Sequence, residues 1–254
     1  NALRSDLGIS IQGNYPVISA GANQLTLGTN WDSYNISWTG TATNVLVLGT
    51  RNKVVNNKIV NTSTSAARTA LFAGANCFVA NNEVISYRGR AVNITTTNCL
   101  IKNNYIHDSN EGIIALSSGN LVVIDGNIIA SNVTAAITTG ATAPTGLFIT
   151  GNTLYGAENK LGIGVNLITA TSSVTLVNNI IAGFVTGVTH ADVQNVGFDD
   201  YNAYYNNTTD VANWVKGPHD SVLNPTFVSV AQLTGATATT SGSGEFASSL
   251  SSCV

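Results

Sequence analysis

The sequence predicts an all-β solenoid of about eight coils of 22–27 residues, with three short strands in each coil. The first reason is a recurring phrase in which an Asn-Asn or Gly-Asn pair separates two short apolar runs. The second is the spacing of these phrases, since repeats of about 20 to 50 residues are typical of units that bury their apolar faces by stacking. The third is composition: only 9% of residues are charged, and Asn, Thr, Ser, Ala and Gly replace them, which suits flat β surfaces better than helices.

The second residue of each pair marks one repeat along the chain. These residues are Asn57, Asn82, Asn104, Asn127, Asn152 and Asn179, and the Tyr-Asn pairs at 34–35 and 201–202 extend the series to Asn35 and Asn202. One unit reads as Leu100-Ile101, the Asn turn, Tyr105-Ile106, a polar loop, and then a run from Gly112, which predicts three strands. An antiparallel sandwich would need hairpin turns between consecutive strands, but Asp125-Gly126 is the single Asp-Gly or Asn-Gly pair. A leucine-rich repeat has a similar period, but its Leu-x-x-Leu-x-Leu frame is missing.

The pattern Asn-Asn-x-Ile, loop, Gly-Ile-x-Leu resembles the repeat of the pectate-lyase-like superfamily over about residues 30–205. The resemblance implies a single-stranded, right-handed parallel β-helix. It also implies that each recurring Asn lies at the tight turn between the second and third strands, where amides of successive coils hydrogen-bond along the axis. Asn tolerates a left-handed backbone, and its amide both donates and accepts hydrogen bonds. We therefore interpret these residues as architectural rather than catalytic.

The repeat divides the chain into four segments. We expect an N-terminal cap at 1–30, the β-helix at 31–205, a C-terminal capping segment at 206–233, and a Ser/Thr/Gly-rich tail or linker at 234–254. Trp214 and Phe227 are expected to cover the last open coil, because an exposed parallel edge invites polymerisation. The chain begins at Asn1 rather than Met, which indicates a processed or excised piece of a longer protein.

Charge and cysteine content narrow the classes of partner. The net charge of −3 provides no basic field for nucleic acid, and no apolar run reaches the roughly 18 residues of a membrane span, so we expect neither nucleic-acid binding nor membrane insertion. The acidic residues form no cluster that would suit calcium, and we expect no metal or other cofactor. Cys77 and Cys99 each precede a recurring Asn by five residues, so they should stack on adjacent coils, and a buried unbonded pair is favoured over a disulfide.

In the superfamily, carbohydrate usually lies along the first strand of each coil and the loop that leads into it. The expected outward row on that strand is Asn93, Ile114, Thr138, Gly164 and Thr189. This row contains no acid or base, which counts against a hydrolase that uses two carboxylates. The adjacent Asp199 and Asp200 should point to opposite faces of a strand, so they are not expected to act as a pair.

The loops that lead into the first strand contain more charged and titratable side chains. Candidate catalytic residues are Arg88, Arg90, His107, Asp108 and Glu111, and candidate substrate-binding residues are Arg90, Asn93, Glu111, Glu158 and Lys160. Because coils stack about 4.8 Å apart, Arg90 and Glu111 should be neighbours. They form either a surface ion pair or the base and carboxylate of a β-elimination on a uronic acid. For His107 and Asp108 we favour a solvated loop over a catalytic dyad.

Three functions remain after these exclusions. The first is a secreted, cell-surface or virion-associated module that binds a polysaccharide or cell-surface glycan, with cleavage as a polysaccharide lyase or glycoside hydrolase left open. The second is a structural module, either a rigid spacer or a subunit that assembles into a trimer or filament. The third, an ice-binding surface, ranks last because Thr95, Thr96 and Thr97 form only one local cluster. A fold by itself does not decide among them.

Overall fold

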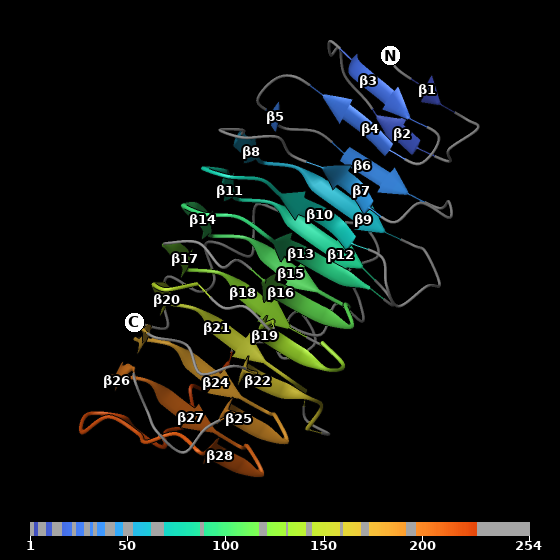
Figure 1. Ribbon diagram of the computed structural model, residues 1–254. Coiled ribbons are helices and arrows are strands. Elements are labelled where there is room, and N and C mark those ends of the chain that lie inside the picture. Colours follow the sequence, from blue (N-terminus) through green and yellow to red (C-terminus); the bar gives the residue numbers. More distant parts are fainter. Residues whose placement is uncertain are drawn as a thin grey trace.

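The computed structural model is an elongated parallel β-helix in which successive coils stack from the N-terminus to the C-terminus (Figure 1). Side chains are described for residues 53–61, 69–86, 89–116, 121–130, 132–140, 144–157, 160–168, 173–191 and 197–227, and before residue 53 the backbone of the strands is described. Within these residues each coil contributes one strand to each of three parallel sheets, as the sequence predicts.

The chain visits the three sheets in a fixed order. Sheet I consists of β5 (Trp31–Asp32), β8 (Lys53–Val55), β11 (Phe78–Ala80), β14 (Cys99–Lys102), β17 (Val122–Asp125), β20 (Leu147–Thr150), β23 (Val174–Val177) and β26 (Phe198–Asp200). The parallel part of sheet II consists of β6 (Asn35–Trp38), β9 (Lys58–Asn61), β12 (Glu83–Ser86), β15 (Tyr105–His107), β18 (Ile128–Ala130), β21 (Thr153–Tyr155), β24 (Ile180–Ala182) and β27 (Ala203–Tyr205). Sheet III consists of β7 (Asn44–Val47), β10 (Thr69–Ala73), β13 (Arg90–Ile94), β16 (Glu111–Ala115), β19 (Ala135–Thr139), β22 (Ile163–Leu167), β25 (Thr186–His190) and β28 (Thr209–Ala212).

Near the N-terminus the pairing becomes antiparallel. β2 (Ile9–Ile11) pairs antiparallel with β6 and with β1 (Leu3–Arg4), and β3 (Val17–Gly21) forms a hairpin with β4 (Gln24–Leu27). The predicted count of about eight coils corresponds to eight rungs of parallel strands, of which about six full turns lie between Asn57 and Asn202.

The core consists of aliphatic columns that run along the axis, one residue from each coil. In sheet I the column is Val54, Val79, Ile101, Ile124, Ile149 and Leu176, all fully buried. Sheets II and III contribute equivalent columns, for example Ile106 above Ile129 and Ile113 above Ile137. Because side chains alternate across a strand, every second residue joins a column and the residues between them face outward.

At the corner between sheets I and II, the two residues of each Asn pair have different roles. The first residue has a positive φ of 53–65° in every described coil, and Asn or Gly occupies it except at Tyr201. The second residue is buried. Left-handed backbone is least costly for Gly and Asn, so the first residue makes the turn and leaves the second amide free to bond along the axis.

The buried amides form a continuous ladder from Asn57 to Asn202. In each of the six links, both the backbone N–H and the Nδ2 of one Asn donate to the Oδ1 of the Asn in the next coil, at 2.9–3.0 Å. From Asn82 onward, Nδ2 also reaches a backbone carbonyl of the preceding coil, such as Val79 O for Asn104 at 3.0 Å. Asn35 does not belong to this register, because it pairs with Lys58, one residue past Asn57. Counting along the sequence from one Asn to the next therefore placed Asn35 one residue away from its true position in the register.

The C-terminal end of the solenoid differs from the prediction in two respects. The parallel stack passes the expected boundary at residue 205, because β28 pairs with β25, and Ser221 then forms a bridge with Ala203. Trp214 is buried against the core at this end, but Phe227 makes an edge-to-face contact with Tyr155 at 5.5 Å. Phe227 therefore packs on the flank of sheet II rather than on the last coil, and the predicted tail at 234–254 lies outside the described residues.

Cys77 and Cys99 occupy equivalent positions on adjacent coils, since Phe78 pairs with Leu100. Both are buried free thiols, as predicted. Burial raises the pKa of the Cys99 thiol above its ordinary value.

Candidate functional site

The outward row of sheet III, where the sequence places the carbohydrate, is closed along much of its length. The register aligns Phe72, Asn93, Ile114, Thr138, Asn166 and Thr189. Asn93 is 5% exposed, and Ile114 and Thr138 are each 2% exposed. These three positions do not present a face to a polymer.

Gly164 is not part of this row. The expectation equated Gly162-Ile163 with Gly112-Ile113, but Ile163 pairs with Ala135, so Asn166 takes the outward position. Gly162 has a φ of +59° and belongs to the loop before the strand. A Cβ on Gly164 would lie 2.4 Å from the Gly187 carbonyl oxygen and 2.9 Å from a methyl group of Ile181, so this position needs a glycine.

Arg90 and Glu111 are neighbours, as their spacing predicts. They pair in register between β13 and β16, and Arg90 Nε lies 3.1 Å from Glu111 Oε2. Both side chains are partly exposed, so the contact is a surface ion pair that contributes at most about 1 kcal/mol. Lys160 precedes β22, two rungs further along sheet III. Arg88 and Glu158 lie outside the described residues.

His107 is not in a solvated loop, contrary to expectation. It is 1% exposed, with Nδ1 2.9 Å from Asp108 Oδ2 and Nε2 3.2 Å from Glu83 Oε1. Lys58 Nζ donates to the same Glu83 oxygen at 2.9 Å, and the Tyr105 ring stacks on the imidazole at 4.1 Å. Strands from three successive coils meet in this cluster because their positions are equivalent in sheet II.

The protonation of this cluster follows from its contacts. Burial alone would lower the pKa of His107, but hydrogen bonds to Asp108 and Glu83 outweigh burial and raise it. Burial alone would raise the pKa of Glu83, but the hydrogen bonds from His107 and Lys58 lower it. Burial, with the charges of Asp108 and Glu83, raises the pKa of Tyr105. Because both imidazole nitrogens are occupied by carboxylates, the cluster holds coils together and offers no ring nitrogen for proton transfer to a substrate.

An open face lies on sheet I, along the flank where Figure 1 shows its strands stacked. Its first outward row contains the residue four positions before each ladder Asn. The row is Lys53, Phe78, Leu100, Val123, Phe148, Thr175 and Phe198, and adjacent members pair in register. Phe148 is 37% exposed and Phe198 is 57% exposed. The row is therefore mainly apolar, with two exposed aromatic rings separated by two rungs.

A second outward row runs parallel to the first, two positions before each ladder Asn. It consists of Val55, Ala80, Lys102, Asp125, Thr150, Val177 and Asp200, of which Val55, Ala80 and Asp200 are buried and the other four are half-buried. Lys102 Nζ lies 2.9 Å from Asp125 Oδ2, and Thr150 Oγ1 donates to Asp125 Oδ1 at 2.9 Å. The sheet I face thus combines an apolar row with a row that contains hydrogen-bonding groups.

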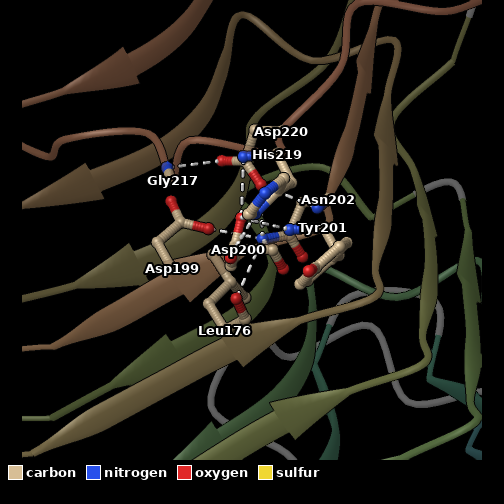
Figure 2. Close-up of polar contacts among 8 residues, drawn as sticks. All are labelled: Leu176, Asp199, Asp200, Tyr201, Asn202, Gly217, His219 and Asp220. Atoms are coloured by element: carbon tan, nitrogen blue, oxygen red, sulfur yellow. Dashed lines mark hydrogen bonds and ion pairs between the residues drawn. The ribbon is translucent and has the colours of Figure 1, made fainter.

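Asp199 and Asp200 point to opposite sides of β26, as alternation predicts. Asp200 lies in the second outward row, where Oδ2 is 2.9 Å from His219 Nδ1 and Oδ1 accepts the His219 backbone N–H at 2.8 Å (Figure 2). Burial would raise the pKa of Asp200, but the contacts with His219 and the Tyr201 backbone N–H lower it. Asp199 faces the core and accepts a hydrogen bond from Trp214 Nε1 at 2.5 Å. The two carboxylates therefore belong to different environments.

Sequence reasoning missed the sheet I face, although a signal for it was present. Counting back four residues from Asn82, Asn152 and Asn202 gives a phenylalanine each time. The signal could not show that this face is more exposed than the predicted row on sheet III, because exposure is a property of the tertiary structure.

A family model described as a right-handed β-helix region matches residues 43–214. No curated protein and no solved structure matches the chain. The described residues contain no helix long and apolar enough to cross a membrane, and no group of three or more His, Cys, Asp or Glu side chains that could hold a metal ion.

Proposed function

We propose that this chain, which belongs to the right-handed β-helix family, is a polysaccharide-binding module that holds an extended, uncharged glycan along the outer face of sheet I. The observation that carries the proposal is the pair of outward rows on sheet I, one apolar with exposed phenylalanines and one containing hydrogen-bonding side chains. A pyranose ring has an apolar face and a rim of hydroxyl groups, so it is complementary to such a pair of rows.

The spacing of the rows supports a linear polymer as the ligand. Adjacent rungs lie about 4.8 Å apart, which is close to the length of one hexopyranose unit in an extended β-linked chain. Phe148 and Phe198 are separated by two rungs, or about 9.6 Å, so their rings would meet every second sugar. A chain lying along the axis would keep this register over several sugars.

The charges of the face favour a neutral glycan over a uronic acid polymer. Lys102 is paired with Asp125, and Lys53 Nζ lies 5.8 Å from the centre of the Phe78 ring. Among the described residues of the two rows, both cations are thus already engaged, and a polymer of carboxylates would meet the partly exposed Asp125 as well. This refines the expected substrate class and moves it away from the polymers that a lyase would cleave.

The face is suited to binding rather than to hydrolysis. Its two carboxylates, Asp125 and Asp200, are three rungs apart, or about 14 Å. Retaining and inverting glycosidases need two carboxyl groups about 5 to 10 Å apart. End-to-end assembly into a filament receives less support, because Asp220 and Ser221 occupy the hydrogen-bonding groups of Asn202 at the last coil.

The proposal is tested by glycan-array binding followed by calorimetric titration with neutral and uronic acid oligosaccharides. Phe148→Ala and Phe198→Ala should each weaken binding about threefold to tenfold, the loss of one aromatic contact. Val133→Ala, which alters a comparably exposed apolar side chain away from sheet I, should leave the affinity unchanged. Binding that is insensitive to both phenylalanines would refute the site.

Two further outcomes separate the alternatives. Preferential binding of uronic acid polymers would contradict the charge argument, and release of new reducing ends or unsaturated sugars would show cleavage. Absence of glycan binding together with trimers or filaments in solution would favour the structural module.

A further inference from the structure

The last coil places a carboxylate in an aliphatic core column. In sheet I, the position three residues before the ladder Asn is occupied by Val, Ile or Leu from Val54 to Leu176, and then by Asp199. Asp199 is 6% exposed. Burying an ionised carboxylate is costly unless it is paired with a cation or fully hydrogen-bonded. The hydrogen bonds around Asp199 therefore determine whether its carboxyl group is ionised or protonated.

The ladder ends at a second carboxylate. Asp220 Oδ1 accepts the backbone N–H of Asn202 at 2.7 Å and lies 3.2 Å from its Nδ2, the same two contacts that Asn202 Oδ1 makes with Asn179. Asp220 Oδ2 accepts the Gly217 N–H at 2.9 Å (Figure 2). Asp220 thus substitutes for the amide of a ninth coil and fixes the segment 213–221, which we call the terminal rung.

The Asn202 amide faces more acceptors than it has hydrogens. Its Nδ2 lies 2.8 Å from Leu176 O and 3.2 Å from both Asp200 O and Asp220 Oδ1, and it makes a short contact with Asp199 Oδ1. A primary amide has two N–H groups. The Asn179 amide, one coil earlier, faces three neutral acceptors. At Asn202 two of the four acceptors are carboxyl groups, so one amide brings the Asp199 and Asp220 side chains together. A proton on one of them removes one of two like charges at this amide.

We propose that Asp199 and Asp220 share one proton, and that this proton latches the terminal rung onto the last coil. The two carboxyl groups belong to opposite sides of the contact: Asp199 to β26 and Asp220 to the terminal rung. Trp214 Nε1 bonds to Asp199, and the Ser221 N–H donates to Asn202 O at 2.8 Å, so both ends of the rung are held at this site. Loss of the proton places two like charges at one amide in a buried position, which favours opening of the rung.

The other charged and titratable groups nearby do not neutralise the pair. Tyr204 OH lies 3.2 Å from Asp199, and burial together with the charges of Asp199 and Asp220 raises the pKa of Tyr204, so the phenol remains a neutral donor. Lys216 lies over the Tyr204 ring, but its Nζ is bonded to Asp210 at 2.6 Å. The remaining groups at this end are His190, whose ring is 5.7 Å from that of Trp214, and His219, which is bonded to Asp200 on the outer face.

The direction of the pH effect follows from the titration of Asp199. Burial raises its pKa, the Trp214 hydrogen bond opposes this, and the charge of Asp220 raises it further, to about 7. In the opened rung the side chain is hydrated and titrates near its ordinary value of 3.8. The closed state therefore binds one more proton between about pH 4 and 7, so the latch is tight at pH 4 and loosens as the pH rises to 7.

Hydrogen exchange of the terminal rung between pH 4 and 8, corrected for intrinsic exchange rates, tests the proposal in the full chain. The opening constant of the Trp214 indole N–H and of the Gly217 and Ser221 amides should rise by up to tenfold per pH unit from about pH 4 to 7 and then level off. Asp199→Asn carries an amide that cannot ionise and can donate to Asp220, so its profile should be flat and protected over this range.

Asp200 and His219 form a second contact between the last coil and the terminal rung, and this contact serves as the control. His219→Gln should retain the Asp199-dependent rise in opening, because the shared proton is intact. Superimposable profiles for the wild type and Asp199→Asn would overturn the proposal. If Asp199→Asn fails to fold, the carboxyl ¹³C shifts of Asp199 and Asp220 in the wild type decide the question: one proton on the pair at pH 5.5 is expected, and two ionised carboxylates would refute the latch.

Discussion

Removing one amide from the middle of the ladder should cost far more than its size suggests. Asn127→Ala deletes Oδ1, which accepts the Asn104 N–H and Nδ2 at 2.9 Å, and Nδ2, which donates to Ile101 O at 2.9 Å. The Asn104 N–H and the Ile101 carbonyl are then buried without these partners. Each unsatisfied backbone group costs about 1–3 kcal/mol, so we expect a loss of about 3–5 kcal/mol in the free energy of unfolding.

The neighbouring residue of the same pair is the matched control. Asn103→Ala changes the left-handed position, where φ is 53°, and should cost about 1–2 kcal/mol because Ala tolerates this backbone poorly. Urea denaturation followed by circular dichroism measures both variants, and hydrogen exchange at Asn104 locates the damage, since repeat arrays can lose cooperativity. A smaller loss for Asn127→Ala than for Asn103→Ala would refute the view that the buried amide, rather than the turn, stabilises the corner.

Two other predictions concern sheets II and III. Glu83→Gln removes the anion beside His107. Its destabilisation, about 1–3 kcal/mol, should be largest between about pH 4.5 and 6.5, because the Glu83 contribution is lost as pH falls through its lowered pKa and the His107 contribution as pH rises through its raised pKa. Urea midpoints at pH 3, 5.5 and 9 test this, and a difference independent of pH would contradict it. Gly164→Ala brings a Cβ to 2.4 Å from the Gly187 carbonyl oxygen and should cost about 1–3 kcal/mol or more, whereas at Gly146 the nearest atom is 3.6 Å away and Ala should be tolerated. Equal thermal shifts for the two alanine variants would exclude the steric explanation.

The amino-acid sequence by itself determined the coil. The period of the Asn pairs, the alternation of aliphatic residues and the scarcity of Asp-Gly and Asn-Gly pairs are local properties, because a strand needs alternation and a tight corner needs Asn or Gly. From these the three-strand coil, the stacking of Cys77 on Cys99 and the opposite directions of Asp199 and Asp200 could be predicted. The contact between Arg90 and Glu111 followed from the same count.

Only the tertiary structure decided register and exposure. Asn35 and Gly164 both fit the repeat pattern of the sequence. The register of the neighbouring strands nevertheless places each of them outside its expected row. His107 was expected in solvent, but burial and two carboxylates enclose it, and the open face belongs to sheet I rather than sheet III. Register and exposure depend on contacts between residues more than 20 positions apart and on the side chains that surround each position. A repeat pattern contains neither kind of information, because every coil that obeys the pattern looks the same until its neighbours are in place.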